Sequence, residues 1–187
     1  APTDNDWGEG LQRTANVWRT NRGRIIDSSV EEFADRVVVR SVREIVDAPS
    51  LFTTVYTFQA DGSLRVEVSW ERKGEFVPEL PRLGMRLMMA QGYKNFTFYG
   101  RGPWENYSDR KESALLGIYE QTTDEQLFPY VRPQESGTKT GLKWAKVTDD
   151  NGTGFLICSD KRFSASALPF GRRDIDMAIT GGGRGMG

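Results

Sequence analysis

Apolar and polar residues alternate with a period of two along several stretches of this chain, and this pattern constrains the fold more than any other feature. The clearest stretch is Leu64–Trp70, where every second side chain is apolar and the side chains between are polar or charged. Such alternation is typical of a β-strand that buries one face and exposes the other. The turn residues Ala60–Ser63 precede it, so we expect a hairpin with the β-branched and aromatic run Phe52–Gln59.

Similar patterns elsewhere predict an all-β chain of about nine strands, a β-sandwich or an incomplete part of a larger one. Residues 1–30 are expected to be irregular apart from a short helix within 11–18, and segment 113–121 fits either a strand or one helical turn. Asn151-Gly152 predicts a second hairpin. The further stretches with strand character are residues 37–45, 83–89, 96–99, 142–148, 155–158 and 163–167.

Residues 95–110 join an aromatic strand to a dense polar corner. Phenylalanines alternate with polar residues over 95–99, and the glycines and proline of 100–103 then require a turn. Residues 104–110 follow with an indole, two carboxylates, an amide, a phenol and a guanidinium. Such a run is either a hydrogen-bonded corner or one wall of a ligand site, and the residues alone favour the corner. We therefore expect the side chains of Asn106, Tyr107 and Asp109 to bond the backbone or one another.

The composition excludes several kinds of chemistry. The chain has no histidine, which rules out His-dependent nucleophiles, His-ligated metals and His general bases. Its 25 basic and 26 acidic side chains nearly cancel, so no nucleic-acid partner is expected. Cys158, the one cysteine, lies in an apolar run and is predicted to be a buried, inert thiol.

The 187 residues predict one domain over 1–187, with the glycine-rich segment 171–187 as a doubtful tail. No apolar run is long enough to predict a membrane span. The chain begins abruptly at Ala1 without a leader, which leads us to expect a fragment of a longer protein. A single cysteine excludes an internal disulfide framework and points to neither a reducing nor an oxidising compartment.

Three segments resemble the C-terminal, small-chain domain of the bacterial β-galactosidases of glycoside hydrolase family 2. Residues 1–8 look like that domain's A-P-x-D-N-D-x-G segment, and residues 98–110 look like its G-x-G-P-x-E-N-Y-x-D-R signature. Residues 129–137 look like its P-Y-x-x-P-x-E-N-G run, with Ser136 where asparagine is usual. The resemblance covers residues 1–168 in the family's order. It weakens over 171–187, where the family's tryptophan-containing M-G-x-G-G-D-x-S-W loop is not complete.

The resemblance implies a galactose-mutarotase-like β-supersandwich that is the last domain of a longer enzyme acting on terminal β-D-galactosides. The family's two catalytic glutamates, used in a retaining mechanism, lie on a separate (β/α)8 barrel. No catalytic residue is therefore expected here, and we reject Glu105 with Asp109 as a catalytic pair. The resemblance makes a structural signature of Gly102, Pro103, Glu105, Asn106, Tyr107, Asp109 and Arg110.

The resemblance also implies a loop that borders the substrate site, formed by Asp4, Asn5, Asp6, Trp7, Gly8 and Glu9. The expected partners are the other domains of the same chain, a galactoside substrate and further copies in a homo-oligomer. No metal or cofactor is expected in this segment, because the family's Mg²⁺ and Na⁺ bind in the barrel. There are two alternative functions: a stand-alone carbohydrate-binding module, which the aromatic content permits, and a sugar epimerase, which the absence of histidine argues against.

Overall fold

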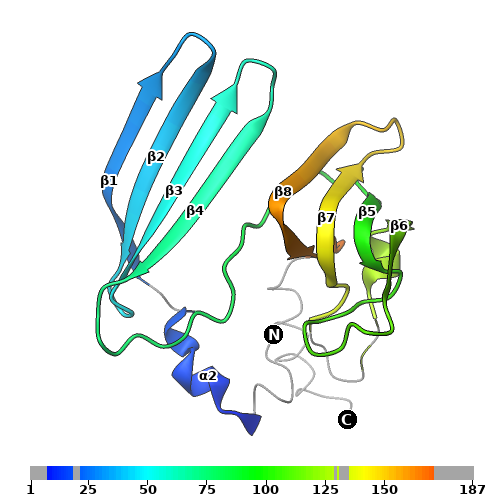
Figure 1. Cartoon of the computed structure of the whole chain (residues 1–187), viewed down its shortest axis with the longest axis horizontal. Coiled ribbons are helices and arrows are strands. Elements are labelled where there is room, and N and C mark those ends of the chain that lie inside the picture. Colours follow the sequence, from blue (N-terminus) through cyan, green and yellow to red (C-terminus); the bar gives the residue numbers. More distant parts are fainter. Residues whose placement is uncertain (1–7, 19–21, 129, 131–134, 171–187) are drawn as a thin grey trace, which may run out of the picture. The chain divides into compact units, whose positions relative to one another are not determined.

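A computed structural model describes residues 8–18, 22–128, 130 and 135–170. The chain divides into two compact units, residues 5–84 and residues 85–187 together with 1–4. Each unit contains one four-stranded antiparallel sheet (Figure 1), which confirms the all-β prediction. Each unit is described by itself, and the single domain expected over 1–187 stays a prediction. The doubtful tail 171–187 lies outside the described residues.

The first sheet is a meander in which every strand pairs with its neighbours in the sequence. Its order is β1-β2-β3-β4, and all three pairings are antiparallel. The predicted hairpin is confirmed, with Gly62 at φ 85° in its turn, where glycine meets no steric penalty. The strand bounds are β1 Gly23–Glu32, β2 Arg36–Ile45, β3 Ser50–Gln59 and β4 Leu64–Arg72.

Strand β1 falls in a segment that the sequence predicted to be irregular, so that expectation was wrong. The alternation of β1 is broken because Ile25 and Ile26 are adjacent and the register with β2 shifts between Ile25 and Asp27. Such a bulge moves one residue out of the period of two. The pattern that identifies its neighbours is therefore absent from β1.

The two faces of the first sheet differ in chemistry. Directly opposed residues of antiparallel strands share a face, and one face carries rows such as Val30–Val39–Tyr56–Val66. The other face carries ion pairs, among them Arg24 with Glu44 at 2.7 Å and Arg65 with Glu67 at 3.2 Å. One side of the sheet is thus mainly apolar. The other side carries the ion pairs together with apolar residues such as Val42 and Val55.

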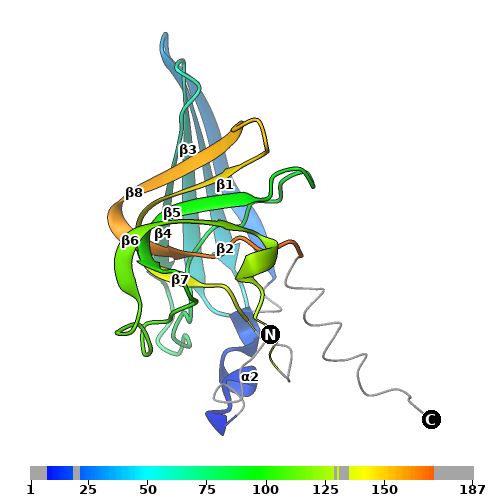
Figure 2. The same cartoon turned by 90° about the vertical axis from the view of Figure 1, so that its right-hand side faces the viewer.

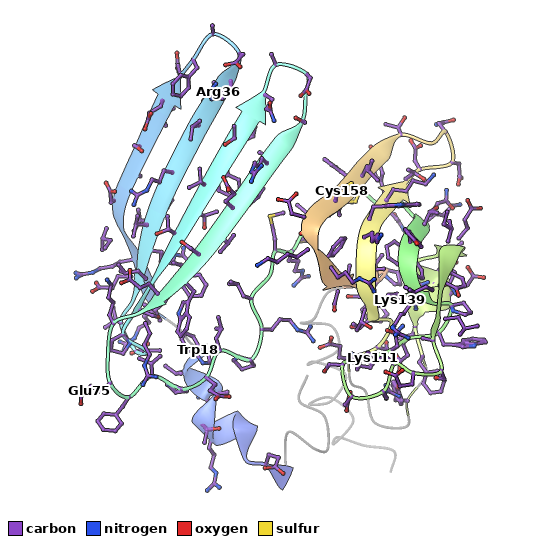
Figure 3. The ribbon with its side chains drawn as sticks, in the orientation of Figure 1. Trp18, Arg36, Glu75, Lys111, Lys139 and Cys158 are labelled. Carbon is purple, nitrogen blue, oxygen red and sulfur yellow. The ribbon has the colours of Figure 1, made fainter. Side chains whose placement is uncertain are left out.

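A small core covers one end of the apolar face. It contains Ile45, Ala48 and Val77, with Phe52, Trp70, Val17 and Trp18 packed against it. The Trp18 and Trp70 rings meet edge to face at 6.1 Å, and the Trp18 indole donates to the Glu79 carbonyl at 3.0 Å (Figure 3). The short helix predicted within 11–18 is present as α2, Leu11–Thr14, followed by the 3-10 turn η1, Asn16–Trp18.

The second sheet has the order β6-β5-β7-β8 (Figure 2), so β5 pairs with β7 as well as with its sequence neighbour. Its core is Phe96, Phe98, Leu142 and Ala145, with Tyr119, Val147, Phe163, Ala165 and Ala167 against it. The bounds are β5 Asn95–Gly102, β6 Leu115–Thr122, η2 Asp124–Gln126, β7 Lys139–Thr148 and β8 Gly154–Ala165.

Strand β5 runs through Gly100 to Gly102, although glycine was expected to end it at Gly100. A Cβ at Gly100 would lie 2.4 Å from the Leu142 Cδ2, so glycine here allows the close approach of β7. Segment 113–121, which fitted either a strand or a helical turn, contains strand β6. The two short strands expected at 155–158 and 163–167 form one continuous strand, β8.

Two further expectations were wrong. Residues 83–89 contain no strand, and Met85, Leu87 and Met88 are exposed. Cys158 is exposed rather than buried (Figure 3). It lies on β8, which is an edge strand of its sheet and is mostly exposed along its length.

Candidate functional site

The polar corner that follows β5 is centred on Asn106, which is only 1% exposed. Its Nδ2 donates to the carbonyls of Arg101 at 3.0 Å and Trp104 at 3.1 Å, and its Oδ1 accepts from the backbone N–H of Thr140 at 3.0 Å and from the Thr140 hydroxyl. The Asn106 backbone N–H donates to the Thr138 carbonyl at 2.8 Å. This one side chain therefore joins the end of β5 to the start of β7.

A carboxylate forms a second link in the corner. Glu105 Oε1 accepts from Arg110 at 2.7 Å and from the Tyr130 hydroxyl, and Oε2 accepts from the backbone N–H of Gly137 at 2.9 Å. The Glu105 side chain is 11% exposed, whereas the Arg110 side chain remains 55% exposed. Glu105 thus ties the corner to the segment that leads into β7.

Tyr107 is half-buried beside this pair. Its hydroxyl donates to the Glu135 carbonyl at 3.2 Å, and the Arg110 guanidinium lies 4.7 Å from the centre of its ring. Burial, followed by the nearby charge of Glu105, raises the pKa of Tyr107 to about 12. The phenol is therefore a neutral hydrogen-bond donor at ordinary pH.

Lys139, the first residue of β7, lies beneath the corner and is only 2% exposed (Figure 3). Its ammonium lies 5.9 Å from the centre of the Phe98 ring. Burial lowers the pKa of Lys139 to about 8, against the opposing attraction of Glu105. Sequence reasoning missed this residue, because nothing in the sequence around Lys139 distinguishes it from an exposed lysine.

We expect Lys139→Met to remove a pH dependence of stability. Between about pH 8 and about pH 10.5 the unfolded chain holds the Lys139 proton and the folded chain does not. Stability therefore rises with pH across that window. The variant should lack this rise and should be more stable at neutral pH by on the order of 1–3 kcal/mol.

Urea melts in steps of pH up to about 10 measure the effect as the difference between wild type and variant, because the contribution of Tyr107, whose pKa rises from 10.0 to about 12 in the folded chain, is common to both. Lys143→Met is the matched control, because Lys143 is an exposed lysine of the same strand. Parallel stability curves for wild type and Lys139→Met would contradict the expectation.

The structure brings together most of the predicted signature. Asn106 and Tyr107 bond the backbone as expected, Glu105 and Arg110 pair with each other, and the peptide bond between the buried Gly102 and Pro103 is cis. Asp109 differs: it is exposed, and within the described part of the chain no hydrogen bond to its side chain is found. The expectation for Asp109 was therefore wrong.

One contributor to the corner was not anticipated. Arg101 donates from Nη1 to the carbonyls of Lys111 at 3.1 Å and Ala114 at 2.9 Å, which fixes the segment between the corner and β6. Arg101 lies between the two glycines of the signature, and this position was the only signal in the sequence that pointed to it.

The loop expected to border a substrate site is only partly described. Asp4, Asn5, Asp6 and Trp7 lie outside the described residues, while Gly8 and Glu9 are exposed. Gly10, which follows them, is buried with φ 70°, and its carbonyl accepts from the backbone N–H groups of Arg13 and Thr14. In this segment Gly10 is the position whose backbone conformation requires glycine.

The corner is arranged to hold backbone segments together. The amide of Asn106 and both carboxylate oxygens of Glu105 are bonded to groups of the protein itself. In the described part of the chain no three acidic, histidine or cysteine side chains come together as metal ligands, and no helix is long and apolar enough to cross a membrane. The fold and the corner together define an all-β module whose polar corner is held by hydrogen bonds within the protein.

Comparison with known proteins shows the family to which this module belongs. The model of the β-galactosidase small chain matches residues 1–180, and the chain belongs to that family. It is 36% identical over 172 residues to a β-galactosidase of Priestia megaterium, covering 91% of this chain and 16% of the relative. It is 31% identical over 186 residues to the β-galactosidase BgaC of Bifidobacterium adolescentis, covering 95% of this chain and 18% of the relative. The resemblance read from the three segments is confirmed, and the chain spans less than a fifth of the length of these relatives.

Proposed function

We propose that this chain is the C-terminal portion of a β-galactosidase that hydrolyses terminal β-D-galactosides, and that it supplies structure beside the substrate site rather than the catalytic groups. The observation that carries the proposal is the family match over residues 1–180 in a chain that spans only 16% to 18% of its relatives. A segment with this relation to longer enzymes contributes one domain to them. The remaining domains, and a galactoside, are its proposed partners, within a homo-oligomeric enzyme.

The hydrogen bonding of the corner favours a structural role for this chain over a catalytic one. A retaining glycosidase needs two carboxyl groups about 5–5.5 Å apart, one of them free to exchange a proton and the other free to attack. Glu105 is instead held by Arg110, Tyr130 and the backbone of Gly137. In our proposal a retaining mechanism of glycoside hydrolase family 2 takes place on a separate barrel, which also binds any Mg²⁺ or Na⁺, and residues 4–9 border the substrate.

The proposal is tested by comparing the chain alone with the chain in a complete enzyme. We expect the isolated chain to release no product from a chromogenic β-galactoside, because both catalytic carboxylates lie elsewhere. We expect the Priestia megaterium enzyme to lose activity when its matching segment is deleted, and to regain at least about a tenth of it when this chain takes the segment's place.

Turnover by the isolated chain that survives removal of trace host enzyme would overturn the proposal. A chimera that folds, as judged by its melting transition, but has no activity would overturn it as well. The deletion variant is the control, because it shows that the restored activity depends on the inserted chain.

A further inference from the structure

Two buried side chains beside the corner each keep an oxygen atom without a hydrogen-bond partner. Ser136 is completely buried and Gln126 is 3% exposed. Within the part of the chain that the structure describes, neither the Ser136 Oγ nor the Gln126 Oε1 forms a hydrogen bond. Such atoms are rare in folded proteins, because a buried polar group that lacks a partner has lost its hydrogen bonds to water without replacement.

The two side chains lie on either side of one close contact. Gly137, which follows Ser136, is buried with φ 75°, and a Cβ there would lie 2.6 Å from the Gln126 carbonyl oxygen and 3.1 Å from the Gln126 Cβ. The same Cβ would lie 3.2 Å from the Leu168 Cδ2. The backbone beside Ser136 is therefore pressed against Gln126 and covered by an apolar side chain.

The remaining contacts of Gln126 show which of its atoms needs a partner. Its Nε2 donates to the Gln121 Oε1 at 3.0 Å and to the Thr122 carbonyl at 3.3 Å. Both donors of the amide are therefore used, and the atom left over is an acceptor. The Ser136 hydroxyl can donate and accept. A group that satisfies both side chains must donate to Gln126 and either donate to Ser136 or accept from it.

The surroundings favour a neutral group of this kind. Two buried charges of the corner, Glu105 and Lys139, have opposite signs and attract one another. An anion would meet the lone pairs of the Gln126 Oε1, and the Glu105 carboxylate already holds the Gly137 backbone N–H at 2.9 Å. A hard cation such as Ca²⁺ takes six to eight oxygen ligands, whereas two side-chain oxygens are free in the described part of this corner.

We propose that a buried water molecule bridges the Gln126 Oε1 and the Ser136 Oγ. The water donates one hydrogen bond to Gln126 and forms a second with the Ser136 hydroxyl. Buried waters typically make about three hydrogen bonds to protein groups that would otherwise be unsatisfied, and they are costly to remove.

The water joins the turn η2 to the segment that leads into β7. Glu105 holds the same segment from the side of the corner, through the backbone N–H of Gly137. The segment before β7 is thus fixed on two sides, once by a carboxylate and once by water. This site goes beyond the proposed function and does not depend on it, because both side chains belong to the described chain.

A crystal structure of the unaltered 187-residue chain, at a resolution that shows ordered water, tests the site directly. We expect a water peak within about 2.7–3.0 Å of both the Ser136 Oγ and the Gln126 Oε1. Oxygen-17 magnetic relaxation dispersion gives the matching measurement in solution, because it counts the waters that stay in a protein for longer than its tumbling time. In Ser136→Asn the longer side chain places an amide N–H where the water lies, so this variant should hold one long-lived water fewer.

Ser50→Ala is the control for the count in solution. Ser50 is also buried, at 1% exposed, but its hydroxyl donates directly to the Ala48 carbonyl at 2.6 Å and needs no water. Its replacement should leave the number of long-lived waters unchanged. The crystal structure of the unaltered chain decides the question by itself if Ser136→Asn does not fold.

Three results would overturn the water site, and all of them leave the proposed function intact. The first is a Ser136 hydroxyl bonded directly to a protein group, with no water beside Gln126. The second is a peak surrounded by oxygens at about 2.3–2.6 Å, which is the distance for a bound cation and not for water. The third is an equal number of long-lived waters in the unaltered chain and in folded Ser136→Asn.

Discussion

Replacing Phe98 by alanine is expected to lower the free energy of unfolding by about 3–5 kcal/mol, because the change leaves a cavity in the core of the second sheet. Phe98 is completely buried, and its ring lies 5.1 Å from that of Phe96 and 5.4 Å from that of Tyr119. The side chain also borders the buried Lys139. Urea melts of the 187-residue chain, followed by circular dichroism, measure the loss.

Phe155→Ala is the matched control for this prediction. Phe155 belongs to the same sheet but is 56% exposed, so its loss should cost less than about 1 kcal/mol. If Phe98→Ala and Phe155→Ala unfolded at the same urea concentration, the cluster around Phe98 would not be the core of this unit.

Replacing Asn106 by leucine is expected to cost about 3–5 kcal/mol as well, although the two side chains have similar volumes. Leucine would leave the carbonyls of Arg101 and Trp104 and the backbone N–H of Thr140 without their partner inside the protein. Each buried polar group left unsatisfied costs about 1–3 kcal/mol. The same urea melts give the difference.

The control for Asn106 comes from the same corner. Ser108 is exposed, and Ser108→Ala should change the free energy of unfolding by less than about 0.5 kcal/mol. A loss for Asn106→Leu as small as that for Ser108→Ala would show that Asn106 does not hold the two strands together.

The sequence predicted strands well where alternation coincided with a pairing partner, as in β3 and β4. It failed for residues 83–89, because an alternating extended segment becomes a strand only when another backbone lies beside it. The prediction for Cys158 failed for a related reason, since an apolar run in an edge strand is not covered on both sides. These outcomes depend on tertiary neighbours, which a local pattern does not specify.

The residues of the candidate site were likewise predicted only in part. Asn106 and Tyr107 were predicted, because residues of these types in a turn commonly bond the backbone. Lys139 was not, because its burial follows from the contact between the start of β7 and Phe98, which are more than 40 residues apart. Which amide or amine becomes buried is decided by the packing of distant segments.

The order of the strands also has a consequence for the time course of folding. All pairings in β1–β4 are between strands adjacent in the sequence, whereas β5 must find β7 across the intervening β6. Closing the longer loop costs more chain entropy before any contact forms, which slows assembly. We expect the meander to form first, with amides of β2 and β3 protected from hydrogen exchange before those that join β5 to β7. Since the meander also leaves the ribosome first, it can form while the second sheet is still being made.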